Sequence, residues 1–377
     1  MLYYSRLMSK VIIKKSTYSY DILKPRVFEL MDALGGELIK KNSYVVIKPN
    51  LLAPAPPDKA IVTHPLVIKA AAEYVLQKGA RPQISDSSAM GSFQKVISES
   101  GIKDALKELD VEFREFKTSL KVDIGEPFGK IEIAEDALNA DFLINLPKLK
   151  THMQMMLTLG VKNLFGCIVG MRKPEWHFRT GVDREMFAKL LINIYKAVSP
   201  SMTLIDGILA MEGQGPGRRG TPKHLGVLMG SRDAIALDIA ICKMLGIHPD
   251  KLLTNKLAKD MGLAGGKIQV EGDFPEIRHF KMPVITPLVF GPQKLHRLMR
   301  KHLVQRPVCD DSICRLCGEC WKYCPAKAIS RERKNLRFDY DKCIRCYCCI
   351  EVCPHAALQA KETLPGKVLR KVLKRGH

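Results

Sequence analysis

Long apolar runs are missing from this sequence. No stretch approaches the roughly 18 consecutive apolar residues that a membrane-spanning helix requires, so no transmembrane segment is predicted. The first residues also lack the apolar core and small-residue cleavage site of a secretory signal. Met8 stands where the first strand pattern begins and is a candidate start. Together these features favour a cytoplasmic protein.

Acidic and aromatic residues are also scarce. Against 60 Lys and Arg there are 39 Asp and Glu, which gives a formal net charge of +21. Such a field attracts nucleic acids, acidic proteins, anionic lipids or small phosphorylated and carboxylated molecules. With only 7% aromatic residues and no interleaving of aromatic and basic residues, nucleic-acid binding is disfavoured. The basic segment 367–375 offers little apolar area for membrane contact.

Cysteine, by contrast, is abundant and unevenly placed. Ten of the 12 cysteines lie between Cys309 and Cys353. Disulfide scaffolds are typical of small secreted domains, whereas cysteines clustered at ligand spacing in a chain of this kind indicate a metal centre. Two complete runs have the form C-x2-C-x2-C-x3-C-P, one beginning at Cys314 and the other at Cys343.

In runs of this form the first three cysteines bind one 4Fe–4S cluster and the fourth binds the other cluster. The sequence therefore predicts two clusters in a bacterial-type ferredoxin module. The first is expected to be held by Cys314, Cys317, Cys320 and Cys353. The second is expected to be held by Cys343, Cys346, Cys349 and Cys324. Zinc sites commonly use two CxxC pairs and do not explain two complete runs. The remaining cysteines, Cys167, Cys242, Cys309 and Cys348, are interpreted as small buried side chains.

Residues 8–265 alternate short apolar runs with helical patterns. This alternation predicts an α/β domain with a mostly parallel sheet and helices on both faces. Strands are expected at 44–48, 83–85, 111–116, 142–145, 202–205 and 225–229, and helices at 65–77, 93–99, 183–198 and 233–245. Residues 266–308 are expected to connect this domain to a small α+β ferredoxin-like domain at 309–360, which is followed by a basic tail at 361–377.

Several polar groups directly follow predicted strands, where sheets of this type bind ligands. The densest stretch is 145–181, where lysines and histidines stand beside Gly-rich turns, a combination that suits an anion. The candidate anion-binding residues are Lys48, Asn50, Lys148, Lys150, Asn163 and Lys173. The candidate catalytic residues are His152, His177 and Lys162.

These residues also have simpler interpretations that involve no binding site. Each lysine taken alone is more typical of a solvated surface. A second metal site built from His64, His152 and His177 with Asp86, Asp206 or Glu212 lacks the i, i+4 spacing of a helical metal motif. The glycine-rich loop 212–220 matches neither a Walker A nor a dinucleotide-binding pattern, and a lid that closes over an anion is an equally good interpretation.

Five motifs together resemble a known family. They are Lys48-Pro49-Asn50, Thr63-His64-Pro65, the NLPKLKTH run from Asn145, the TLGVKNLFG run from Thr158, and Asp206-Gly207. The sequence resembles, over about residues 8–360, the prokaryotic family of iron–sulfur proteins named domain of unknown function 362. Many members carry a C-terminal two-cluster ferredoxin domain. The resemblance implies the α/β fold and the clusters, and it identifies no catalytic residue.

The favoured function is a reductase-type redox enzyme, an iron–sulfur oxidoreductase. In this hypothesis an acidic carrier such as a ferredoxin or flavodoxin reduces the clusters. The clusters then reduce an anionic substrate or cofactor bound in the α/β domain. One alternative is a non-enzymatic electron carrier or maturation factor for a partner protein. Clusters with a purely structural role and nucleic-acid binding are further alternatives.

Overall fold

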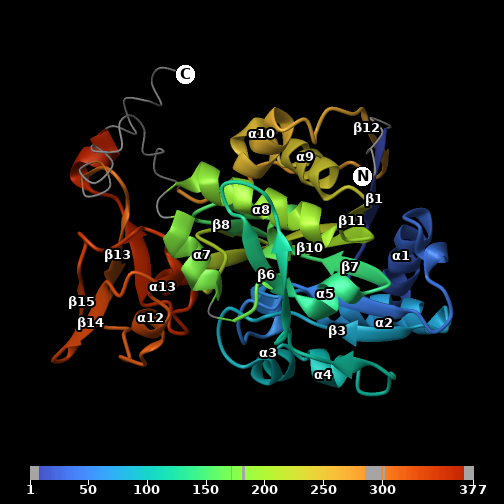
Figure 1. The fold of residues 1–377 in the computed structure, drawn as a ribbon, viewed down its shortest axis with the longest axis horizontal. Helices are drawn as coiled ribbons and strands as arrows, with labels where there is room; N and C mark the ends of the chain where they lie inside the picture. The colour runs from blue at the N-terminus through green and yellow to red at the C-terminus, as the bar shows by residue number, and fades with distance from the viewer. Residues whose placement is uncertain (1–7, 171, 181–182, 285–298, 300–301, 369–377) are drawn as a thin grey trace.

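The computed structural model describes residues 8–170, 172–180, 183–284, 299 and 302–368. The large part of the chain is built on a ten-stranded sheet (Figure 1). In spatial order its main path is β12 (Ile268–Gly272), β1 (Ser9–Lys15), β11 (Gly220–Ser231), β10 (Met202–Gly213), β7 (Phe142–Leu146), β2 (Tyr44–Pro49), β3 (Arg81–Ile84) and β4 (Glu112–Phe113). Strand β8 (Lys148–His152) pairs with β10, and β9 (Met156–Thr158) pairs with β8.

Strand β2 shows why the sheet is covered on both faces. Val45 and Ile47 join one buried core cluster, whereas the intervening Val46 joins another. Successive side chains of a strand point to opposite faces, so an apolar run of this kind needs helices on both sides. The first core contains α1 (Tyr20–Ala33), α2 (Pro65–Gln77), α3 (Phe93–Glu99) and α4 (Ile102–Ala105). The opposite face carries α5 (Glu135–Asn139), α6 (Gly160–Asn163), α7 (Arg172–Thr180), α8 (Arg184–Val198), α9 (Ala234–Met244) and α10 (Leu253–Asp260).

Most strand pairs in this sheet are parallel, and the antiparallel ones are β1–β11, β10–β11 and β8–β9. Figure 1 shows α8, α9 and α10 on one side of the sheet and α3 and α4 on the other. The predicted α/β class is thereby confirmed. A separate hairpin, β5 (Ser119–Asp123) with β6 (Lys130–Ala134), packs against α5. Within the described residues no helix has the length and apolarity needed to cross a membrane.

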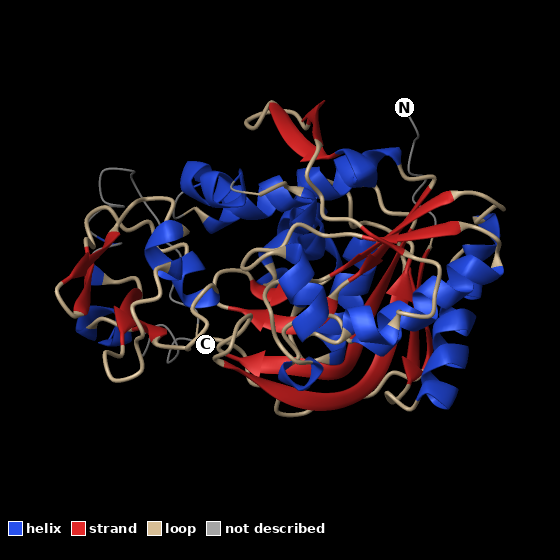
Figure 2. Cartoon of the chain, turned by 90° about the horizontal axis from the view of Figure 1, so that it is seen from below, coloured by secondary structure: helices blue, strands red, loops and turns tan. Residues whose placement is uncertain are grey.

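The small C-terminal module consists of two similar halves. Strand β13 (Arg306–Cys309) pairs with β16 (Leu358–Lys361), and β14 (Ile329–Glu332) pairs with β15 (Asn335–Phe338). The short helices α12 (Glu319–Lys322) and α13 (Cys348–Glu351) contact each other. Each element of the first half recurs in the second at the offset that separates Cys314 from Cys343. Figure 2 shows these short strands at one end of the molecule, beside the main sheet.

The C-terminal module packs directly against the large part of the chain. Val352 of the module belongs to the core formed with α1 and α2, and Tyr323 packs against that same core. In the other direction, Met153 belongs to the module's own apolar cluster. The predicted connection at 266–308 contributes β12 to the main sheet, where it pairs in parallel with β1, and β13 to the module. Much of the predicted basic tail, 369–377, lies outside the described residues.

Candidate functional site

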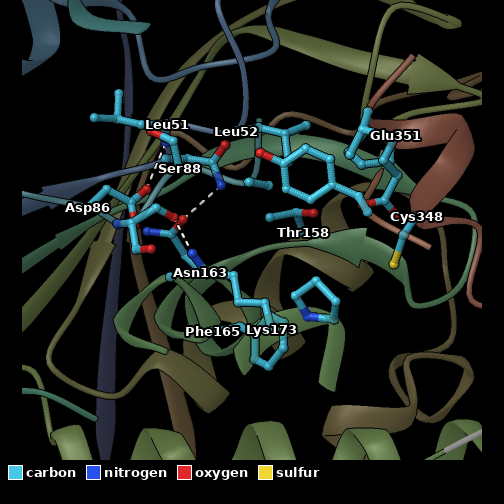
Figure 3. Close-up of a pocket in the computed structure, with 18 of the residues that line it drawn as sticks. Leu51, Leu52, Asp86, Ser88, Thr158, Asn163, Phe165, Lys173, Cys348 and Glu351 are labelled. Atoms are coloured by element: carbon cyan, nitrogen blue, oxygen red, sulfur yellow. Dashed lines mark hydrogen bonds between the residues drawn. The ribbon is translucent and has the colours of Figure 1, made fainter. Parts of the chain in front are cut away.

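A cavity of about 410 Å³ lies where the carboxyl ends of the strands meet the C-terminal module. The large part supplies residues that follow β2 and β3, together with residues of β8, α6 and α7. The module supplies Lys322, Tyr323, Cys348, Glu351 and Val352. Figure 3 shows Cys348 and Glu351 facing Asp86, Ser88 and Asn163 across this space. The cavity is therefore a junction between the two parts of the chain.

Three lysines bring positive charge to the cavity wall: Lys150 and Lys173 are buried, and Lys162 is half-buried. Lys150 donates from Nζ to Asn50 Oδ1 at 2.7 Å and to the Ile61 carbonyl oxygen at 2.6 Å. Lys173 donates to the carbonyl oxygen of Ser87. None of Lys150, Lys162 and Lys173 has an ion-pair partner among the described residues. Burial lowers the pKa of all three, to about 8 for Lys173. A bound anion would relieve this desolvation cost.

A chain of amides holds Lys150 in place. Asn50 donates from Nδ2 to Asn163 Oδ1 at 2.8 Å, and Asn163 donates from Nδ2 to Asn145 Oδ1 at 2.9 Å. Asn145 in turn donates to the Gly160 carbonyl oxygen at 2.9 Å, which ties α6 to β7. Asn50 and Asn163 also line the cavity. Buried amides satisfied in this way fix the position of the ammonium group that they contact.

Two of the candidate anion-binding lysines do not line the cavity. Lys48 pairs with Asp86 at 2.9 Å, and Lys148 pairs with Asp206 at 2.8 Å. Lys148 also donates to the Tyr18 hydroxyl, which in turn donates to Asp206. Their charges are thus neutralised inside the fold. The structure groups Asn50, Lys150, Asn163, Lys173 and Lys162 around the cavity and leaves Lys48 and Lys148 behind its wall.

Asp86 connects the buried ion pair to the cavity that it lines. Its Oδ2 accepts from the backbone amide of Leu51, and its Oδ1 accepts from that of Ser87, both at 2.9 Å. Gly166 lies directly against Asp86 and Lys48, and an added Cβ would overlap both side chains. A glycine is needed here because of this close approach.

The two candidate catalytic histidines also line the cavity. His152 Nδ1 accepts from the backbone amides of Gln154 and Met155, so Nε2 carries the proton in the neutral ring. That Nε2 lies 3.2 Å from Glu351 Oε1 of the module. Burial lowers the pKa of His152 well below 6.5 and that of His177 to about 3, and Lys162 adds to both shifts. Both rings are therefore neutral near pH 7.

The acid sensitivity of His177 gives a testable prediction. Its ring packs against Phe165 and Phe187, and its Nδ1 is buried without a hydrogen-bond partner among the described residues. Because the folded pKa is about 3 and an unfolded histidine titrates near 6.5, its contribution to stability is intact above pH 6.5 and is lost as pH falls toward 3. The loss is about 1.4 kcal/mol per pH unit. The variant His177→Phe should flatten this slope.

Urea unfolding of both proteins between pH 7 and pH 5, followed by circular dichroism, measures the difference. Equal slopes for wild type and His177→Phe would show that this ring is not the source of the acid sensitivity.

The structure gives no support to the second metal site considered from the sequence. Among the described residues, the histidines of that site do not come together with Asp86, Asp206 or Glu212 in a group placed to hold a metal ion. His64 stacks on Tyr18 with ring centroids 3.6 Å apart, and its Nδ1 accepts from the amide of Leu66 at the start of α2. Glu212 is paired with Lys223 at 3.2 Å.

The cysteines of the module surround two separate small cavities. One is lined by Cys314, Cys317, Cys320 and Cys353. The other is lined by Cys324, Cys343, Cys346 and Cys349. Each cavity thus offers four thiols, the number that a 4Fe–4S cluster takes, and each group includes one cysteine from the other run. The donor set fits such a cluster, which accepts one electron at a time when bound.

The backbone around the cysteines follows the same repeat. Leu316 and Arg345, at equivalent positions between the first two cysteines of each run, both have positive φ values, of 49° and 60°. Amide hydrogen bonds reach the fourth cysteine of each run: Ala328 N donates to Cys324 Sγ at 3.2 Å, and Ala357 N donates to Cys353 Sγ at 3.3 Å. Donors of this kind stabilise thiolate ligands and tune cluster potentials.

The glycine-rich loop between β10 and β11 fastens the module to the large part. Arg219 Nε donates to the Leu358 carbonyl oxygen at 2.7 Å, and Arg218 donates to that of Pro54 at 3.0 Å. A Cβ added at Gly217 would stand 3.1 Å from the Glu351 carbonyl oxygen, so the loop closely approaches α13. Pro216 lines the cavity. The loop, for which a lid was one interpretation, therefore spans the junction.

Sequence reasoning missed the residues that the module contributes to the cavity. Cys167, Cys242 and Cys348 are all buried, as expected, but Cys348 also lines the cavity wall. The repeat contains a signal for this difference, because Cys348 occupies the position equivalent to Glu319 in the first half. The change from a charged residue in α12 to a cysteine in α13 indicates that the two short helices have different surroundings.

The fold and the cysteine geometry define an α/β protein joined to a ferredoxin-like iron–sulfur domain, of the class that transfers electrons. The comparisons agree. The family model described as "Domain of unknown function (DUF362)" matches residues 45–243, and that of the 4Fe-4S dicluster domain matches residues 306–354. The chain belongs to this family of unknown function.

The chain is also similar to individual proteins. A thylakoid-associated protein of Synechocystis sp. is 34% identical over 305 residues, covering 78% of this chain and 94% of that protein. Pyruvate synthase subunit PorD of Thermotoga maritima is 39% identical over 59 residues, covering 15% of this chain and 60% of that subunit. The lactate racemase apoprotein from Thermoanaerobacterium thermosaccharolyticum has a TM-score of 0.39 at 17% identity, over 62% of this chain and 56% of that one.

Proposed function

We propose that this chain is a cytoplasmic iron–sulfur oxidoreductase that reduces an anionic small molecule held in the junction cavity. Two 4Fe–4S clusters would occupy the two four-cysteine cavities, and an acidic carrier would supply their electrons. The observation that carries the proposal is the wall shared by α13 and the buried lysines. Cys349 belongs to a four-cysteine group, and Cys348 and Glu351 of the same short helix line the cavity.

The residues of this chain have distinct roles in the proposal. Lys162 and Lys173 bind the anionic group of the substrate, and Lys150, positioned by Asn50, adds a third cation. The neutral His152 offers its Nε2 proton as a hydrogen-bond donor rather than as a cationic acid. When bound, the clusters supply single electrons across α13. Burial beneath the module excludes bulk water and strengthens each of these electrostatic contacts.

Replacing Lys162 by alanine tests the cavity directly. An ammonium-to-anion hydrogen bond contributes about 1.5–3 kcal/mol, so the affinity should fall roughly ten- to a hundredfold. The probes are inorganic phosphate and short dicarboxylates, titrated by calorimetry into the anaerobic, cluster-loaded protein. The matched control is Lys196→Ala, an exposed lysine at the end of α8.

Two outcomes separate the proposal from the alternative of a carrier or maturation factor. A selective loss of anion binding in Lys162→Ala, with iron and sulfide content unchanged, supports the enzyme. If wild type, Lys162→Ala and Lys196→Ala all bind these anions equally weakly, the cavity is not an anion site and the relay function is favoured.

A further inference from the structure

The two four-cysteine cavities differ in what surrounds them. The cavity lined by Cys324, Cys343, Cys346 and Cys349 lies beside α13, whose Cys348 and Glu351 line the junction cavity. The other cavity includes Cys317, which is exposed to solvent, and is also lined by Arg315, whose side chain is exposed. The first of these cavities therefore adjoins the junction cavity, whereas the second has a ligand position that is exposed to solvent, and we call it the outward-facing cavity.

The outward-facing cavity is bordered by a basic hairpin. Leu336 of β15 lines this cavity, and the hairpin formed by β14 and β15 exposes Arg331, Arg333, Lys334 and Arg337. Its single acidic residue, Glu332, lies 3.5 Å from Arg337. Among the described residues, Arg331, Arg333 and Lys334 have no ion-pair partner. This leaves three uncompensated cations next to a solvent-exposed ligand position.

The equivalent strand pair, β13 with β16, has a different environment. Strands β13 and β16 correspond to β15 and β14 in the repeat, and β16 is held against the large part by Arg219, which donates to the Leu358 carbonyl oxygen at 2.7 Å. Figure 1 shows β14 and β15 at the end of the molecule far from the main sheet. Of these two equivalent strand pairs, β13–β16 thus contacts the large part of its own chain, and β14–β15 faces solvent.

We propose that the β14–β15 hairpin, together with Arg315, is the docking surface for an acidic electron-carrier protein. This inference rests on the proposed redox function. The carrier loses one electron to the group held by Cys314, Cys317, Cys320 and Cys353, and no bond forms or breaks. The second four-cysteine group, whose Cys349 directly follows the cavity-lining Cys348, then receives the electron. Charge complementarity favours an acidic protein, because like-charged carriers would be repelled and opposite charges accelerate encounter.

The test compares two triple variants that remove the same charge. The docking variant is Arg331→Gln, Arg333→Asn and Lys334→Gln, with asparagine chosen because Arg333 has a φ of 51°, which asparagine tolerates. The control variant is Lys41→Gln, Lys103→Gln and Lys107→Gln, three exposed lysines of the large part. Stopped-flow absorbance records cluster reduction in the full chain by a reduced acidic flavodoxin, and separately by photoreduced deazariboflavin, a small uncharged donor.

At low ionic strength, the docking variant should be reduced by flavodoxin about tenfold more slowly than wild type, and added salt should narrow this difference. The control variant should stay within about twofold of wild type, and deazariboflavin should reduce all three proteins alike. Equal rates for the docking and control variants with flavodoxin would overturn the proposal. A second result would also overturn it. If the docking variant kept the wild-type rate with flavodoxin but was no longer retained on a DNA column, the hairpin would be a nucleic-acid surface. Neither result alters the phosphate affinity by which the Lys162→Ala experiment judges the proposed function.

Discussion

Replacing Cys353 by alanine is expected to remove the same cluster that Cys317→Ala removes. Cys353 belongs to the second run, yet it lines the cavity of Cys314, Cys317 and Cys320. Because a 4Fe–4S cluster takes four cysteine ligands, loss of one ligand should destabilise the whole group, and iron should fall from about eight to about four per chain. The two variants should therefore leave identical residual electron paramagnetic resonance spectra after reduction.

The complementary pair is Cys324→Ala and Cys346→Ala, which line the other cavity. These variants should match each other and differ from the first pair. Chemical iron and sulfide determination on anaerobically prepared proteins gives the count, and the spectra give the pairing. A Cys353→Ala spectrum that matched Cys346→Ala would mean that each run binds its own cluster. Cys242→Ala, a buried cysteine of α9, is the control and should keep all of its iron.

Removing Asp206 is expected to give a large loss of stability. Asp206 and Lys148 are both fully buried, 2.8 Å apart, and Asp206 also accepts hydrogen bonds from Tyr18 and the backbone amide of His64. Asp206→Ala leaves the ammonium group buried without its carboxylate, which typically costs about 3–5 kcal/mol. Anaerobic urea unfolding followed by circular dichroism measures the change in the free energy of unfolding.

The matched control for this variant is an exposed ion pair in the same sheet. Lys10 and Glu271 lie 2.8 Å apart with both side chains substantially exposed. Glu271→Ala should change the free energy of unfolding by less than about 1 kcal/mol. If Asp206→Ala cost no more than this control, Lys148 would have to be uncharged or solvated in the folded chain.

Local signals in the sequence were sufficient for part of this structure. Helix α2 begins and ends where the sequence predicts, because His64 and Pro65 begin it and Gly79 follows its end. The grouping of the first three cysteines of each run could also be predicted locally from their spacing, whereas the fourth cysteine comes from the other run and followed from the known ferredoxin pattern. By contrast, β8 was not predicted, because all five of its residues are buried although three of them are Lys148, Lys150 and His152.

Which candidate lysines are neutralised depends on carboxylates that lie far away in the sequence. Lys48 and Lys148 differ from Lys150 only in having a carboxylate within reach, Asp86 for one and Asp206 for the other. Nothing in the local sequence reports a pairing of that kind. The same limit applies to Glu351, which approaches His152 from a different part of the chain. The sequence therefore pointed to residues that line the junction cavity, and it could not separate the lysines paired with a carboxylate from those without one.

The position of α13 has a consequence for a damaged protein. This helix of four residues contains Cys349, which belongs to a four-cysteine group, and it also presents Glu351 to the junction cavity. In the proposed function, loss of the cluster held by Cys349 would remove one of the contacts that fix α13 and would weaken the cavity wall that this helix forms. On the same proposal, a chain that can no longer deliver electrons would also bind the anion less tightly. Inactivated molecules would thus not compete with intact ones for a scarce substrate.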